Sequence, residues 1–278
     1  MTIRIVTDSG CDLPADVASE LGIEIVPLTI RFGDEEFVDR RDLTPEVFWQ
    51  RCAASATLPE TAAPAPGAFE EVYRSLAAGG ATGVIVVSLS AALSATMQSA
   101  ELAARSVASV VPVTVVDSRS VTLGQGMIAV AAARLAAAGA GHDDVVAAVH
   151  SLAARTKVWG ALDTLDNLKK GGRIGGAKAM LASVLSIKPI IEVRDGKVEE
   201  GGKQRTRSKA LAFLVEKVQS YGAIENLAVA HAACPDVDGF VEQLRHLASG
   251  EVIVGNIGPV VGSHAGRGTM GVAFQTAV

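Results

Sequence analysis

The sequence predicts an α/β protein with two α/β domains. Short apolar runs alternate with amphipathic helical stretches in the first half of the chain, which is typical of a largely parallel sheet with helices on both faces. From Lys157 this alternation changes, and a tight turn at Asp195-Gly196 joins two expected strands, which favours a mixed sheet. We therefore expect an N-terminal domain at residues 1–156 and a C-terminal domain at residues 157–278.

The composition narrows the class of protein. Hydrophobic residues make up 49% of the 278 residues and aromatic residues only 4%, so the expected cores consist of Val, Leu, Ile and Ala. A formal net charge of −5 argues against a nucleic-acid partner, which needs a basic face. Cys11, Cys52 and Cys234 lie far apart, so neither a disulfide framework nor structural zinc is indicated. The chain begins directly with an expected strand, and no apolar run approaches the roughly 20 residues of a membrane span, so we expect a cytoplasmic protein.

Caps and turns predict the first elements. Ile3–Thr7 is an expected strand, and Asp12 is the expected N-cap of a helix at Ala15–Leu21. Ile23–Ile30 is apolar enough for a second strand. Gly33-Asp34 lies between apolar flanks and predicts a hairpin.

Proline residues mark the next boundaries. Thr44-Pro45-Glu46 is the expected start of a helix that ends near Ala54. Leu58–Pro66 contains three prolines, which exclude a regular helix and favour a plain connector. A helix is then expected at Ala68–Ala78.

The stretch Val84–Ala100 carries the strongest functional signal. Four apolar residues predict a buried strand, and a run of small residues and hydroxyls follows before apolar residues recur at helical spacing. This order places hydroxyls and free backbone N–H groups at the carboxyl edge of a sheet, where open α/β sheets bind ligands. The N-terminus of a helix also favours an anion. The sequence therefore predicts a site for an anionic head group, with Ser88, Ser90, Ser94 and Thr96 as the hydroxyls.

The remaining elements follow from apolar periodicity and turn residues. Strands are expected at Val113–Asp117, Ile187–Val193, Lys197–Glu200, Leu227–Ala232, Val252–Val260 and Gly271–Thr276. Helical segments are expected at Leu123–Ala138, Asp143–Thr156, Leu162–Leu168, Lys178–Leu185, Thr206–Tyr221 and Asp236–Ala248.

Two glycine-rich segments carry polar side chains. Gly171–Gly176 superficially resembles a phosphate loop, but it follows an expected helix rather than a strand. Arg173 lies among these glycines, where it either reaches an anion or a partner or remains solvated. His264 follows the apolar run that ends at Val261, and its small neighbours leave the ring accessible at an expected sheet edge. We find no spacing typical of metal ligands among the histidines.

Ser94 and His264 also suggest a second function, that of a serine-type hydrolase or small-molecule transferase. Ser94 would act as the nucleophile and His264 as the base. However, the chain has no GxSxG elbow, and several hydroxyls at one strand end suit the binding of a carboxylate better than attack on a carbonyl. We therefore rank a binding protein above a hydrolase, and a plain regulatory or scaffold protein is the third interpretation.

Eight short segments, which together span nearly the whole chain, form a joint pattern. In order they are TDSGCDLP (Thr7–Pro14), ETAAP (Glu60–Pro64), SLSAALSATMQSA (Ser88–Ala100), VDSRSVTLGQG (Val115–Gly126), LKKGGRIG (Leu168–Gly175), IKPII (Ile187–Ile191), DGKV (Asp195–Val198) and IGPVVGSHAGRG (Ile257–Gly268). This pattern resembles the DegV family of bacterial fatty-acid-binding proteins, which serve fatty acid kinase. Each segment is short, and the specificity lies in their joint order.

The resemblance implies that a long-chain fatty acid lies between two α/β domains. Matching positions imply that Thr61, Ser94 and His264 contact its carboxylate. Such a protein is not an enzyme and needs no metal or cofactor besides the fatty acid. It presents the carboxyl group to a separate ATP-dependent fatty acid kinase, which makes the acyl phosphate, and transient contact with a membrane is compatible with this role. Candidates for the surrounding network or for kinase docking are Ser263, Arg173 and Arg205.

The sequence departs from the family pattern at four positions. Ala62-Ala63 stand where the family usually has Ser-Gln, Ala95 replaces a glycine and Met97 replaces a tyrosine. Because Thr61 and Ser94 are retained, the expected contacts to the carboxylate are also retained.

Overall fold

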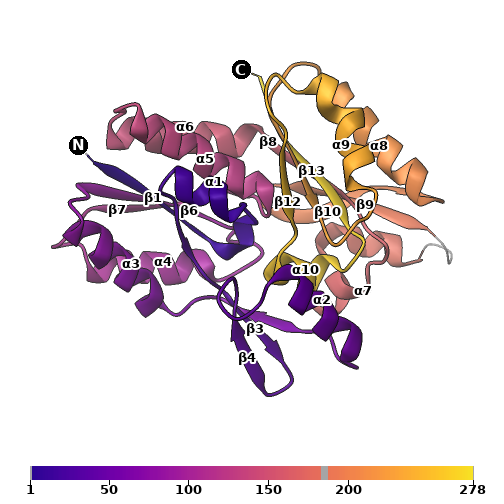
Figure 1. The fold of residues 1–278 in the computed structure, drawn as a ribbon, viewed down its shortest axis with the longest axis horizontal. Coiled ribbons are helices and arrows are strands. Elements are labelled where there is room, and N and C mark those ends of the chain that lie inside the picture. Colours follow the sequence, from indigo (N-terminus) through magenta and orange to yellow (C-terminus); the bar gives the residue numbers. More distant parts are fainter. Residues whose placement is uncertain (1, 183–186, 278) are drawn as a thin grey trace.

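The computed structural model describes residues 2–182 and 187–277, which contain three β-sheets flanked by helices (Figure 1). The first sheet is entirely parallel, with the order β2-β1-β6-β7. Its strands are β1 (Ile3–Asp8), β2 (Glu24–Val26), β6 (Gly83–Ser88) and β7 (Val113–Asp117). The predicted parallel N-terminal sheet is therefore confirmed.

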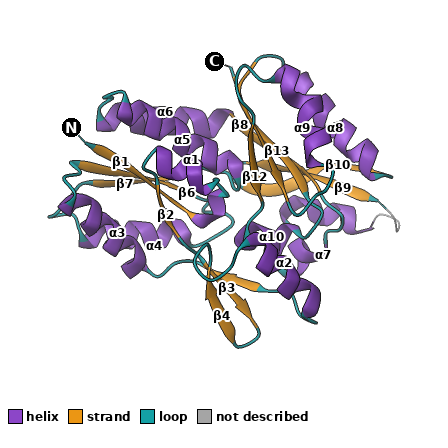
Figure 2. Ribbon diagram, in the orientation of Figure 1, coloured by secondary structure: helices purple, strands orange, loops and turns teal. Residues whose placement is uncertain are grey.

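Helices cover both faces of the parallel sheet because its strands are apolar on both sides (Figure 2). Val84 and Val86 of β6 pack into a core with α3 and α4, whereas Ile85 and Val87 pack into a core with α5 and α6. These four helices are α3 (Pro66–Ala78), α4 (Thr96–Ser106), α5 (Leu123–Ala137) and α6 (His142–Arg155). The short helix α1 spans Ala15–Glu20.

The second sheet is mixed, as predicted, with the order β10-β9-β8-β13-β11-β12. All neighbouring strands are antiparallel except β11 and β12. Helices α8 (Arg207–Ser220) and α9 (Val237–Leu244) pack on one face of this sheet. The strands are β8 (Thr156–Ala161), β9 (Lys188–Arg194), β10 (Lys197–Gln204), β11 (Ile224–His231), β12 (Ile253–Asn256) and β13 (Met270–Thr276).

Helix α5 joins the two larger sheets into one core. It is apolar on all sides, which is typical of a helix buried within a protein. Ile128 of α5 belongs to the same core cluster as Ile5 of β1 and Ala228 of β11. The parallel and the mixed sheet therefore hold a fixed relation through α5, and the loops at their facing edges lie close together.

A small antiparallel sheet with the order β4-β3-β5 lies beside this core. Gly33, with φ +60°, makes the turn of the predicted hairpin between β3 (Thr29–Phe32) and β4 (Glu35–Val38). The third strand is β5 (Glu60–Ala62). The adjoining helices are α2 (Pro45–Ala54), α7 (Asp166–Lys170) and α10 (Pro259–Ala265), and short 3₁₀ turns occur at Ser9–Cys11, Gly175–Ala182 and Arg245–Leu247.

Three expected strands or connectors differ from the structure, and one observed strand was not expected. The expected strand Ile23–Ile30 divides between β2 and β3, which belong to different sheets. The expected connector Leu58–Pro66 contains β5, because pairing with β3 stabilises three residues that could not form a strand alone. Only Ile253–Asn256 of Val252–Val260 is a strand, since Pro259 begins helix α10. Strand β8 was not expected, because it follows α6 without an intervening turn residue.

Two expected helix features also change. Asp12 does not cap α1, because Pro14 holds the N-cap position and the Asp12 carboxylate instead accepts a hydrogen bond from Gly258 N at 2.9 Å. The expected helix Lys178–Leu185 is a 3₁₀ helix at Gly175–Ala182, and residues 183–185 lie outside the described part of the chain.

The start of β8 at Thr156 supports the expected division of the chain. We propose that the N-terminal domain ends near residue 156, since β8 and every later strand belong to the mixed sheet. Across the described residues, no helix combines the length and the apolar character that a bilayer span requires.

Candidate functional site

Thr61 and His264 meet at one side of the small sheet. Thr61 lies on β5, opposite Ile30 of β3, and His264 lies near the end of α10. The Thr61 Oγ1 atom is 2.9 Å from His264 Nε2, although the two residues are 203 positions apart. The structure therefore brings together two of the residues predicted to contact a carboxylate. His264 itself lies on a helix rather than in a turn after a strand, which corrects the expected local structure.

The surroundings of His264 keep its ring neutral. Burial lowers the pKa of the imidazole to about 4 because the charged ring would lose its water, and the nearby Arg173 adds repulsion. The second ring nitrogen, Nδ1, is buried and has no hydrogen-bond partner among the described residues. It packs against the backbone of Gly171, where a methyl group would collide with Nδ1 and Cε1. Only glycine therefore allows this close approach at position 171.

Ser94 lies in the hydroxyl-rich loop between β6 and α4, as the sequence predicts. Its Oγ atom is 2.8 Å from Thr96 Oγ1 and accepts a hydrogen bond from Thr96 N at 3.3 Å. The loop begins at Leu89, whose N–H donates to the buried Asp8 carboxylate at 2.8 Å. Burial raises the pKa of Asp8 to about 6, because the loss of water outweighs the hydrogen bonds that favour the anion.

An inner cavity of about 180 Å³ lies between the parallel and the mixed sheet. Thr61, Ser94 and His264 all line it, so the three predicted carboxylate contacts share one cavity. Most of the other walls are apolar and come from both halves of the chain. They include Leu28, Leu89, Leu93, Val121, Ile191, Val193, Val198, Val260 and Val261. The sequence could not identify these residues, because the same composition also describes a solid core.

A larger outer pocket of about 610 Å³ lies beyond the Thr61–His264 pair. Thr61, Arg173 and His264 line both spaces. The remaining walls of the outer pocket are mainly polar, and they include Cys52, Ser55, Thr57, Glu60, Lys170 and Ser263. The pair is therefore shared between an apolar cavity and a polar pocket.

The three residues predicted for the surrounding network differ in their roles. The guanidinium of Arg173 donates to Leu93 O at 3.1 Å and to Gly171 O at 2.7 Å, so it links the Ser94 loop to the glycine-rich segment. Ser263 is buried and donates to Pro259 O at 2.7 Å within α10. Arg205 is exposed after the end of β10, and it lines neither the inner cavity nor the outer pocket.

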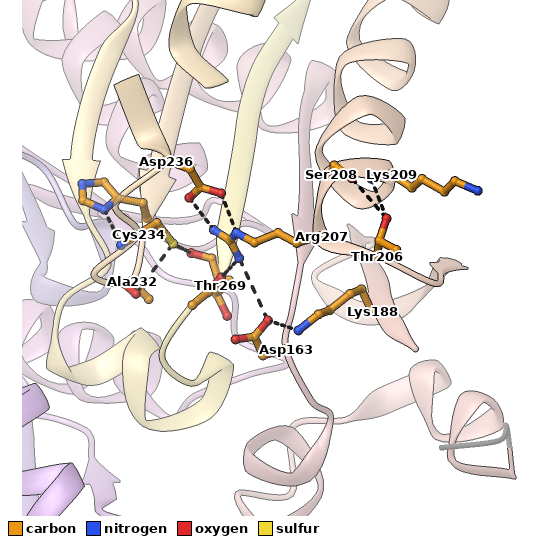
Figure 3. A network of polar contacts seen from close by, with 12 residues as sticks. Asp163, Lys188, Thr206, Arg207, Ser208, Lys209, Ala232, Cys234, Asp236 and Thr269 are labelled. Atoms are coloured by element: carbon orange, nitrogen blue, oxygen red, sulfur yellow. Dashed lines mark hydrogen bonds and ion pairs between the residues drawn. The ribbon is translucent and has the colours of Figure 1, made fainter. Parts of the chain in front are cut away.

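A polar network around Arg207 reaches the segment that follows α10 (Figure 3). Arg207 forms a paired contact with the Asp236 carboxylate at 2.6 and 2.8 Å and donates to Gly268 O at 2.6 Å. Asp163 Oδ1 lies 4.0 Å from Arg207 Nη1 and also forms an ion pair with Lys188 Nζ. Sequence reasoning missed this network, because its members lie far apart in the chain and no local motif links them.

Ser94 and His264 do not form a nucleophile–base pair in this structure. The Ser94 hydroxyl forms a hydrogen bond with the Thr96 hydroxyl, and His264 Nε2 forms one with the Thr61 hydroxyl. Proton transfer from a serine nucleophile needs a direct hydrogen bond to its base or a single bridging water. This geometry favours binding over the alternative of a serine-type hydrolase or small-molecule transferase.

The fold and the site define an α/β protein in which a largely apolar cavity lies between the two larger sheets. Comparison with known proteins then identifies the family. The family described as "Uncharacterised protein, DegV family" matches residues 2–277, and the chain belongs to this family. A DegV domain-containing protein of Streptomyces coelicolor is 38% identical over 99% of this chain and 98% of its own length.

Solved structures of relatives share the whole fold. A DegV family protein from Thermus thermophilus, described as fatty acid binding, is 33% identical with a TM-score of 0.92 over 100% of both chains. DegV from Bacillus subtilis, described as a fatty acid binding protein, is 27% identical with a TM-score of 0.86 over 100% of both chains.

Proposed function

We propose that this protein binds a long-chain fatty acid in the inner cavity, with the carboxylate at Thr61, Ser94 and His264. One observation carries the proposal: three hydrogen-bonding side chains, two of them in direct contact, line one largely apolar cavity between two sheets. The two related structures described as fatty acid binding support the same ligand class.

The energetics assign different tasks to the tail and the head group. Roughly fifteen methylenes at ~0.8 kcal/mol each contribute about 12 kcal/mol. Association and ordering oppose binding by ~4–15 kcal/mol, so the tail supplies most of the affinity. Each hydrogen bond to the carboxylate adds about 1.5–3 kcal/mol. The hydroxyls of Thr61 and Ser94 can donate such bonds and thereby fix the direction in which the fatty acid lies.

We further propose that the protein is a non-catalytic carrier, which presents the carboxylate to a separate ATP-dependent kinase. A carboxylate oxygen would form a bond to the γ-phosphorus of ATP. The bond between that phosphorus and the bridging oxygen would break, and its electron pair would leave with ADP. The outer pocket supports this role, because it gives the Thr61–His264 pair a second, polar side.

Extraction and binding measurements test the proposal. Mass spectrometry of the denatured protein should release a long-chain fatty acid, and delipidated protein should bind palmitate. Thr61→Ala and Ser94→Ala should each weaken palmitate binding by about tenfold or more, since each loses a hydrogen bond to a charged group. Thr57→Ala is the matched control, because Thr57 lines only the outer pocket.

Two results would count against the proposal. If delipidated protein does not bind palmitate, the proposed ligand class is wrong. If Thr61→Ala and Ser94→Ala both keep the wild-type affinity, the assignment of these residues to the carboxylate is wrong. The kinase step is tested separately by adding a bacterial fatty acid kinase and ATP and trapping the acyl phosphate with hydroxylamine. Acyl phosphate formed by this protein and ATP alone would show that it is itself the catalyst.

A further inference from the structure

The residues that follow β1 contact both sides of the proposed carboxylate site. Asp8, the last residue of β1, accepts a hydrogen bond from Leu89 N at 2.8 Å, where the hydroxyl-rich loop begins. Asp12 accepts from Gly258 N at 2.9 Å, where helix α10 begins, although these two residues are 246 positions apart. The short segment Asp8–Asp12 therefore holds the hydroxyl-rich loop at one end and α10 at the other.

Asp12 fits closely between the end of β12 and the start of α10. It is 5% exposed, and its backbone has the left-handed conformation, with φ 51°. A Cβ atom at Gly255 would lie 3.0 Å from Asp12 O, and a Cβ atom at Gly258 would lie 2.9 Å from Asp12 Oδ1. Both distances are shorter than ordinary van der Waals contacts, so the two glycines are what allows Asp12 to lie here. The first turn of α10 is therefore placed directly against the Asp12 carboxylate.

Helix α10 carries part of the cavity wall with it. Val260, Val261 and His264 line the inner cavity, and all three lie on this helix of seven residues. Such a helix is only about two turns long, so a shift of its first turn also moves His264. The hydrogen bond between Thr61 and His264, at 2.9 Å, would be lost after a movement of about 1 Å.

We propose that Asp12 is a positioning residue for the fatty-acid carboxylate, because it fixes where α10 places His264. Asp8 holds the opposite side through the hydroxyl-rich loop, so the segment Asp8–Asp12 sets the spacing between the two sides. Asp12 lines neither the inner cavity nor the outer pocket, and it acts on the ligand only through α10. This inference rests on the proposed function, since it adds a supporting residue to the same carboxylate site.

Binding of palmitate and of hexadecanol separates positioning from general support of the fold. The two molecules have tails of the same length, but the alcohol lacks the charged carboxylate. Asp12→Ala removes the acceptor of Gly258 N, so the affinity for palmitate should fall by about tenfold and that for hexadecanol by less than about threefold. Asp12→Asn keeps an acceptor oxygen and should restore most of the affinity for palmitate. Asp16→Ala is the matched control, because Asp16 is exposed on α1 and lines neither space.

Gly258→Ala perturbs the same contact from the side of α10. The φ of −74° and ψ of 178° at this position suit alanine, so the backbone itself is not strained. Either α10 or the buried Asp12 carboxylate must move to admit the new methyl group, although donor and acceptor both remain. We again expect a loss of affinity that is greater for palmitate than for hexadecanol. If Asp12→Ala does not fold, Gly258→Ala decides the question, and an equal effect on both molecules would overturn the proposal.

The position of α10 can also be measured without a ligand. Trp49 of α2 packs against this helix, since a Cβ atom at Gly262 would lie 3.0 Å from its Cζ2. Trp159 is the second tryptophan and belongs to a different core cluster. In protein labelled with fluorotryptophan, the fluorine resonance of Trp49 should shift in Asp12→Ala and return toward its wild-type position in Asp12→Asn. The resonance of Trp159 should stay in place, and Trp159→Phe assigns the two signals.

The outcomes separate this inference from the proposed function. If Asp12→Ala weakens palmitate and hexadecanol equally, Asp12 supports the cavity in general and the positioning role is wrong. The role is also wrong if the affinity for palmitate is unchanged, or if the resonance of Trp49 does not move. If wild-type protein binds neither molecule, the proposed function and the role at the carboxylate fail together, and the resonance of Trp49 then shows only whether Asp12 places α10.

Discussion

Two segments of the site are held in place by opposite physical means. The loop before Ser94 is fixed from a fully buried cluster, in which the Asp8 carboxylate accepts from Gly10 N at 3.0 Å, Leu89 N at 2.8 Å and Gln125 Nε2 at 3.0 Å. The segment after His264 is fixed by Arg207, which donates to Gly268 O. Arg207 and its partner Asp236 are partly exposed, with side-chain exposures of 29% and 37%.

The surroundings shift the pKa values of Asp8 and Asp236 in opposite directions, because Asp8 is fully buried and Asp236 is partly exposed. Loss of water raises the pKa of Asp8 to about 6, although four hydrogen bonds act in the other direction. The hydrogen bond with Arg207 is the main cause that lowers the pKa of Asp236. A buried carboxylate therefore costs free energy by itself and stabilises the loop only through the donors that would otherwise lack an acceptor. The partly exposed pair gains from attraction between its charges, and water limits that gain.

Asp8→Ala tests the buried side and should have the largest effect on stability. The substitution leaves the N–H groups of Gly10 and Leu89 without their acceptor, whereas the Gln125 amide keeps Thr7 Oγ1 and Val87 O. We expect the free energy of unfolding to fall by about 3 kcal/mol. Urea unfolding followed by circular dichroism measures this loss. Asp34→Ala in the exposed hairpin turn is the control and should stay within about 0.5 kcal/mol of wild type.

If Asp8→Ala lowers the free energy of unfolding by less than about 1 kcal/mol, the described difference between the buried and the partly exposed segment is contradicted. It would mean that the donors find water or other acceptors and that the buried carboxylate does not hold the loop. Asp8→Asn sharpens the test, because it keeps one acceptor oxygen and should recover part of the lost stability.

We expect the second-largest effect from Asp12→Asn, which should change how the free energy of unfolding depends on pH. Asp12 is buried beside Asp39 and Arg40, and its Oδ1 accepts from Gly258 N. Burial raises its pKa from 3.8 to about 7, so the folded protein binds this proton more tightly than the unfolded chain. Stability should therefore decrease as pH rises from about 4 to 7, and Asp12 should contribute about 2 kcal/mol of this loss between pH 5 and 8.

The measurement compares urea unfolding of wild type and Asp12→Asn at pH 5 and pH 8. Asparagine keeps the acceptor for Gly258 N and cannot ionise, so the variant should lose less stability with rising pH. His264 and His231 have lowered pKa values and contribute a slope of opposite sign at acidic pH, but they are present in both proteins. Parallel curves for the two proteins would show that burial does not shift the pKa of Asp12.

Local rules predicted the parts of the fold that depend on neighbours in sequence. Val84–Val87, the Gly33 hairpin and the Asp195-Gly196 turn each depend on a short pattern, and each was found. The short strand β5 depends on its partner β3 instead, so its polar residues and the prolines that flank it gave no strand signal. A signal for α10 was present in Pro259, since proline is favoured at the first position of a helix.

For the candidate site, local sequence patterns predicted even less than they did for the fold. The hydroxyl-rich loop around Ser94 follows from the strand–helix pattern, and His264 was a candidate from its small neighbours, whereas Thr61 and the carboxylate role of His264 came from family resemblance. Their hydrogen bond joins β5 to α10 across 203 positions, and no periodicity describes such a contact. Gly171 was noted only as part of a glycine-rich segment that superficially resembles a phosphate loop, although its lack of a side chain is what allows the His264 ring to pack there.

Arg207→Lys tests the partly exposed side and should have the smallest effect. Lysine keeps the positive charge but cannot form the paired contact with Asp236 and also donate to Gly268 O. We expect a loss of about 1 kcal/mol, because both side chains remain accessible to water. A double-mutant cycle of Arg207→Gln and Asp236→Asn, in which both charges are removed, isolates the energy of the pair. A coupling energy as large as the loss in Asp8→Ala would show that the pair acts as a buried contact, and the distinction between the two segments would fail.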